Sequence, residues 1–106
     1  MPKYMLQVSY TAEGAKGLLK DGGSKRRQAA ESLVKSVGGK LEAFYFAFGG
    51  SDAFVIVDLP DNASVAAASI TLAASGAATG KTTVLITPEE MDQAAKKSIS
   101  YTPPGR

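Results

Sequence analysis

The sequence contains no histidine, no cysteine and no tryptophan among its 106 residues. Without histidine or cysteine, nucleophilic triads, thiolate chemistry, disulfide bonds and the usual zinc and haem ligand sets are excluded. We therefore expect no cofactor and no metal. Charge is also scarce, because 12 Lys and Arg against 10 Asp and Glu leave a net charge of only +2. That charge is too small for the basic surface of a nucleic-acid-binding protein, so no nucleic acid partner is expected.

Long apolar runs are missing as well. The best candidate, residues 63–79, is interrupted by serine and threonine, and it falls short of the ~18 apolar residues of a membrane span. The N-terminus shows no basic and then apolar segment of a secretory signal. We therefore expect a soluble, cytoplasmic protein without membrane contacts. We assign residues 1–97 to one domain and residues 98–106, with Pro103-Pro104-Gly105, to a C-terminal arm or disordered tail.

Alternation of apolar and polar residues predicts four strands, at 3–10, 40–48, 53–59 and 81–87. A short turn, Gly49-Gly50-Ser51-Asp52, joins the middle two strands as a hairpin. Strict alternation places side chains of strand 40–48 in two rows. One row holds Phe44, Phe46 and Phe48, and the other holds Leu41, Ala43, Tyr45 and Ala47.

Three helices are predicted at 24–37, 63–79 and 88–97. Ser24 is a candidate cap for the first, whose apolar stripe is Ala30, Leu33, Val34 and Val37. The second is rich in alanine and is expected to end at Gly80. The third begins with Thr87-Pro88-Glu89-Glu90, the pattern of a capping box. The glycine-rich residues 11–23 are predicted to form a loop with one helical turn around 15–19.

The resulting order is β-α-β-β-α-β with a terminal helix. It predicts an α+β, ferredoxin-like fold, with both long helices on one face of a four-stranded antiparallel sheet. The middle strands are apolar on both sides, so one apolar row faces away from the helices. We predict that a second copy covers it and forms a dimeric α+β barrel. Alternatively, the C-terminal segment folds back over that face with Met91, Ala94, Ala95, Ile99 and Tyr101.

Several segments resemble one known family: Met-Pro-Lys-Tyr at 1–4, Gly-Gly-Lys-Leu-Glu-Ala-Phe-Tyr-Phe-Ala-Phe-Gly at 38–49, Asp-Leu-Pro-Asp at 58–61 and Leu-Ile-Thr-Pro-Glu-Glu-Met at 85–91. Over residues 1–97 the chain is similar to the GYD domain family, named for a Gly-Tyr-Asp triplet. Here the triplet is Gly50-Ser51-Asp52, with serine in place of tyrosine. If the tyrosine of the family triplet has a function, Tyr10 or Tyr45 is the candidate to perform that function in this chain. The resemblance implies a ferredoxin-like dimeric barrel and no particular activity.

Two carboxylates are candidates for chemistry. Asp52 either points into a pocket as a base or acceptor, or it stabilises its own turn. Asp58, if buried, must pair with a cation such as Lys3, Lys40 or Lys81 across the sheet, or else it reaches water at the strand end.

The ligand-binding candidates are Tyr10, Tyr45, Arg26, Arg27 and Ser51. Lys25, Arg26 and Arg27 stand in the first turn of a predicted helix, where cations oppose the helix dipole. They therefore form either an anion site or a solvated basic face that pairs with Glu31. Gln7, Ser9, Tyr10 and Tyr45 are polar groups on apolar strands. They either line a barrel cavity for a small organic molecule or satisfy the backbone. The row of Phe44, Phe46 and Phe48 is core or dimer interface.

Two functions follow from this set. The first is a homodimeric structural or binding module for a small hydrophobic or anionic ligand. The alternative is a cofactor-free, metal-independent enzyme for a small organic substrate. In that enzyme Asp52 or Asp58 would be the base, and Tyr10, Tyr45 or Arg26 would donate hydrogen bonds.

Overall fold

A single antiparallel sheet holds all strands of the computed structural model, which describes residues 1–106. The strands are β1 (Lys3–Tyr10), β2 (Lys40–Phe46), β3 (Ala53–Asp58) and β4 (Ala78–Leu85). Their order across the sheet is β2-β3-β1-β4, and every neighbouring pair is antiparallel. This is the predicted α+β, ferredoxin-like arrangement.

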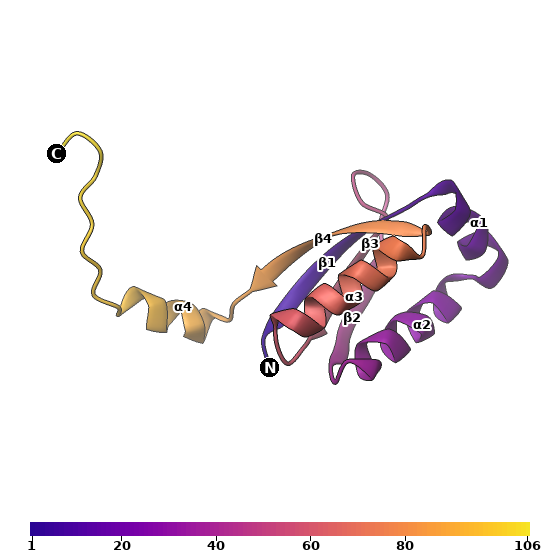
Figure 1. Cartoon of the computed structure of the whole chain (residues 1–106), viewed down its shortest axis with the longest axis horizontal. Helices are drawn as coiled ribbons and strands as arrows, with labels where there is room; N and C mark the ends of the chain where they lie inside the picture. The colour runs from indigo at the N-terminus through magenta and orange to yellow at the C-terminus, as the bar shows by residue number, and fades with distance from the viewer.

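Four helices accompany the sheet: α1 (Ala12–Asp21), α2 (Gly23–Ser36), α3 (Asn62–Ala74) and α4 (Pro88–Ala95). Helix α2 packs along β2 and α3 packs along β4, over the same face of the sheet. Each helix therefore lies over one of the two edge strands. We call the face that they cover the helix face and the opposite one the open face (Figure 1).

Helix α1 corrects the prediction of a loop over residues 11–23. Thr11 caps it by accepting a hydrogen bond from the Gly14 amide, and the Thr11 hydroxyl donates to the carbonyl of Gly76 at 2.8 Å. A Cβ on Gly14 would lie 1.9 Å from the carbonyl oxygen of Ala77. Glycine at position 14 therefore permits a close approach between α1 and the turn before β4, and it does not mark a break in the helix.

Other element ends also differ from the sequence prediction. Helix α2 follows Gly22, which has φ +81°, so Ser24 lies inside the helix and is not its cap. Helix α3 ends at Ala74 instead of residue 79, because residues from Ala78 onward pair with β1, and Gly80 lies opposite Val8. Sheet pairing thus overrides the helix propensity of alanine there.

Strand β2 carries an irregularity that strict alternation cannot show. Its register against β3 shifts between Leu41 and Ala43. As a result Leu41 packs against the core together with Phe44, contrary to the predicted row with Ala43 and Tyr45. The strand also ends at Phe46, so Phe48 stands outside it and is fully exposed.

The core lies between the helix face of the sheet and helices α2 and α3. Its buried residues include alternate positions of β1 and β3 and one side of each helix. They are Tyr4, Val8, Val34, Ala53, Val55, Val57, Leu59, Val65 and Ala78. The hydroxyl of Tyr4 donates to the side-chain oxygen of Asn62 at 2.9 Å, which joins β1 to the start of α3.

The chain leaves the body of the protein after β4. Helix α4 and residues 96–106 project away from the sheet (Figure 1). The radius of gyration is 17.0 Å, against about 13 Å for a compact chain of this length. Met91, Ile99 and Tyr101 are exposed, so this segment does not fold back over the open face. None of the helices is long and apolar enough to cross a membrane.

Candidate functional site

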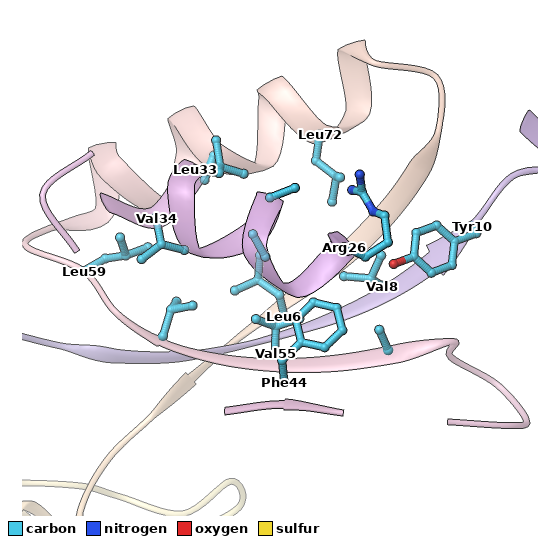
Figure 2. A pocket seen from close by; sticks show the side chains of 15 residues that line it. Leu6, Val8, Tyr10, Arg26, Leu33, Val34, Phe44, Val55, Leu59 and Leu72 are labelled. Carbon is cyan, nitrogen blue, oxygen red and sulfur yellow. The ribbon is translucent and has the colours of Figure 1, made fainter. Parts of the chain in front are cut away.

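The main apolar cavity of the protein lies between the helix pair and the sheet. Its volume is about 100 Å³, and 14 of its 15 lining residues are hydrophobic (Figure 2). Strands β1, β2 and β3 form its floor, and α2 and α3 form its walls. The lining residues include Leu6, Val8, Leu33, Val34, Phe44, Val55, Leu59 and Leu72.

The cavity has a physical origin in the small side chains around it. Ala30 of α2, Ala53 of β3 and Ala68 of α3 all face it. The two helices lie over the edge strands, so these short side chains do not fill the space above β1 and β3. A close-packed interior of larger residues would leave no such space. We therefore treat this cavity as the candidate site.

One end of the cavity is polar. Arg26 is the only charged residue in the lining, and Figure 2 shows its side chain and the Tyr10 hydroxyl at the same end, with Leu59 toward the other. Both ion pairs of the chain belong to Lys3, so the half-buried Arg26 has no carboxylate partner. Glu13 and Asp21 line the adjoining hollow beside Arg26 without pairing with it.

Helix α2 directs its three consecutive cations, Lys25, Arg26 and Arg27, to different sides. Arg26 lines the cavity, whereas Arg27 lies toward β2, in shallow hollows lined also by Glu31, Phe44 and Tyr45. Arg27 makes no ion pair with Glu31. Lys25 is exposed and lines neither region. The three cations therefore do not converge on one site.

The polar residues expected to line a barrel cavity lie on both faces of the sheet. Tyr10 shares the helix face with Val8, whereas Gln7 pairs with Phe54 and lies on the open face with Ser9. Tyr45 lies opposite Phe54 on the open face and is 70% exposed. The expected barrel cavity with Tyr10 and Tyr45 together is therefore wrong for one chain, because the two side chains lie on opposite sides of the sheet.

Asp52 connects the hairpin loop to β1. Its carboxylate accepts a hydrogen bond from the Tyr10 amide at 2.8 Å, and its own amide donates to the Val8 carbonyl at 2.8 Å. It lines a shallow hollow with Tyr10, Leu18 and Phe46, outside the main cavity. Ser51, beside it in the loop, is half-buried and also lies outside the main cavity. The contacts of Asp52 are those of a residue that positions β1.

Asp58 pairs with Lys3, one of the three predicted partners. The ammonium of Lys3 donates to Asp58 at 2.9 Å and also contacts Glu42. These hydrogen bonds, with Asp58 as the larger cause, raise the pKa of Lys3 above 10.5. The pair lies at one end of the open face, where Lys40, Asp58 and Lys3 are in register, so Asp58 does not reach the cavity.

The open face has an apolar centre. This centre lies between the charged end with Lys3, Lys40 and Asp58 and a polar edge at β4. Met5 and Ile56 are paired across β1 and β3, and Phe54 and Tyr45 are paired across β3 and β2. On the β4 side the row continues with Thr83 and Lys81. No helix of the chain lies over these residues (Figure 1).

Sequence reasoning missed the cavity itself. The stripe of α2 and the alanines of α3 were both visible, but neither shows how far apart the two helices lie. The available signal was the shortage of large apolar residues in α3, where only Val65, Ile70 and Leu72 exceed alanine in size among the apolar positions. Since Ile70 is 69% exposed, only two of these three can fill the core.

Comparison with known proteins gives one match. No curated protein and no solved structure matches the chain. The model of the GYD domain family matches residues 4–95, which covers all four helices and the sheet apart from Lys3 at the start of β1. The chain therefore belongs to the GYD domain family.

Proposed function

We propose that this protein is a small-molecule-binding module that works as a homodimer, with the cavity between α2, α3 and the sheet as its ligand site. The cavity is the observation that carries the proposal. Its lining is apolar apart from Arg26 and the Tyr10 hydroxyl, which is the usual composition of a small-molecule pocket. Its volume of about 100 Å³ is comparable with the engineered apolar cavity of ~150 Å³ that holds benzene.

The positions of the acidic residues favour binding over catalysis. A general base must lie within hydrogen-bonding reach of the atom that it deprotonates. Asp52 is hydrogen-bonded to the Tyr10 amide, and Asp58 is paired with Lys3 on the other face. Neither carboxylate lines the cavity. The alternative of an enzyme with one of these two bases therefore has no support from the geometry.

The homodimer rests on the open face. Met5, Phe54, Ile56 and Tyr45 form an apolar centre that the chain itself leaves uncovered. Monomeric proteins rarely expose contiguous apolar patches larger than a few hundred Å². A second copy packed about a two-fold axis would bury the same residues on both chains.

A cavity-filling variant tests the ligand site. We expect hexanol to bind the wild-type protein saturably, with amide shifts in nitrogen–proton NMR spectra confined to residues around the cavity. Ala68→Leu adds a large side chain to the cavity wall, because Ala68 is buried and faces the cavity. That variant should lose most of the binding, since its side chain occupies the space of the ligand.

The matched control is Ala66→Leu, an exposed position on the same helix. It makes the same chemical change outside the cavity and should bind hexanol as the wild type does. Ala30→Leu, which fills the cavity from α2, gives a second test should Ala68→Leu fail to fold. The absence of saturable shifts in the wild type, or equal binding by the two α3 variants, would contradict the proposal.

A further inference from the structure

The cavity has one charged group and one hydroxyl, and both lie at the same end. Arg26 and Tyr10 come from different elements, α2 and β1, and the fold brings them to the mouth of the same cavity (Figure 2). Leu33, Val34 and Leu59 form the far part of the lining. The site therefore has a polar end and an apolar end.

The polar groups at the mouth are free to bind a ligand. Neither ion pair of the chain involves Arg26. The hydroxyl of Tyr4 finds a partner in Asn62, but the hydroxyl of Tyr10 has no hydrogen-bond partner within the protein. A guanidinium group offers two parallel N–H donors, a geometry that matches a carboxylate.

We infer that the cavity binds a small monocarboxylate with an apolar body, its carboxylate held by Arg26 and the Tyr10 hydroxyl and its hydrocarbon part among Leu33, Phe44 and Val55. This inference rests on the proposed function and adds the chemical class of the ligand. The volume of about 100 Å³ limits the apolar body to fewer than six carbons, because the six carbons of benzene occupy a larger cavity of ~150 Å³.

The surrounding charges support a single negative group and not several. Glu13 and Asp21 line the hollow next to the mouth, so a dianion would be repelled on that side. The first turn of α2 has no acidic residue that would compete for Arg26. A monocarboxylate satisfies the one unpaired cation of the lining without adding a second charge near these acids.

The test compares hexanoate with hexanol, which share a chain of six carbons and differ in the head group. At neutral pH we expect the wild type to bind hexanoate at least about tenfold more tightly, as charge-assisted hydrogen bonds imply. Arg26→Gln should remove that preference, because it should weaken the binding of hexanoate far more than the binding of hexanol. Tyr10→Phe should weaken hexanoate severalfold. Titrations followed by NMR or calorimetry give both affinities.

Arg27→Gln is the matched control, since it removes the same charge from the next residue, outside the cavity. It should keep the preference for hexanoate. Equal affinities for hexanoate and hexanol in the wild type would overturn the inference while leaving the proposed ligand site intact. Equal losses of hexanoate affinity in Arg26→Gln and Arg27→Gln would overturn it too, because they would show a general effect of charge. If neither probe binds, the proposed function itself fails.

Discussion

At the scale of single residues, two glycines of α1 have different surroundings. A Cβ on Gly14 would lie 1.9 Å from the carbonyl oxygen of Ala77, the same oxygen that accepts the hydrogen bond of the Thr11 amide. A Cβ on Gly17 would meet nothing within 4 Å. The first glycine is therefore required by packing, and the second only adds flexibility to the unfolded chain.

Alanine substitutions should separate these roles. We expect Gly17→Ala to stabilise the protein by about 0.5–1 kcal/mol, because alanine restricts the unfolded chain and favours the helix. Gly14→Ala should destabilise it by about 1–3 kcal/mol, since α1 or the turn at Ala77 must shift. Urea unfolding of the two variants measures both changes. The same sign for both would mean that α1 does not pack against that turn.

At the scale of elements, α3 depends on an acidic cap. The carboxylate of Asp61 accepts hydrogen bonds from the Ser64 amide at 2.9 Å and from the Ser64 hydroxyl at 2.8 Å. These bonds, the amide first, lower the pKa of Asp61 below 3.8. The stabilisation by this cap is therefore complete above the ordinary pKa and is lost as the pH falls through the lowered value.

The variant Asp61→Asn should reveal this dependence. Asparagine is also a good helix cap, so near-neutral stability should change little. Below the ordinary pKa of 3.8 the wild type loses the contribution of the ionised cap, whereas the variant has no charge to lose. The urea midpoint of the wild type should therefore fall more steeply than that of Asp61→Asn as the pH falls. Parallel pH profiles for the two proteins would contradict the role of Asp61.

Helix α4 is specified locally, and none of its residues is buried. Thr87 and Glu90 form a complete capping box, with Pro88 in the first turn. Eight residues are too few for a stable isolated helix in water, since even good sequences need about 12–15. Its Met91 is exposed, as are Ile99 and Tyr101 beyond it.

At the scale of the whole molecule, the uncovered open face is the basis for predicting a dimer. We expect the full chain to be a dimer in light scattering, because a second copy would cover Met5, Phe54 and Ile56. Ile56→Asp places a charge at the centre of this face and should yield a monomer. Ile70→Asp is the control, because Ile70 is 69% exposed on α3, and it should remain a dimer.

Two results would contradict the dimer. One is a monomeric wild type, and the other is an Ile56→Asp variant that is still dimeric. If Ile56→Asp aggregates, the oligomeric state of Tyr45→Asp is measured instead. Tyr45 is 70% exposed on the same face, so its replacement perturbs the fold less.

The sequence by itself determined the elements whose signals are local. Alternation in 3–10 and 53–59, the stripe of Leu33 and Val34, and the capping box at Thr87 are each confirmed. Period and capping depend on the backbone of a few consecutive residues, so they can be read without knowing the neighbours. The order of these elements then leaves few topologies, and the ferredoxin-like sheet is one of them.

The tertiary structure alone decided what depends on distance between elements. It brought α1 against the turn before β4, where Gly14 lies close to Ala77, and it chose Lys3 as the partner of Asp58. It also placed Tyr10 and Tyr45 on opposite faces and left a cavity under alanine-rich α3, with Arg26 at its mouth. Helix spacing and sheet register are set by packing across the chain, which no local pattern records.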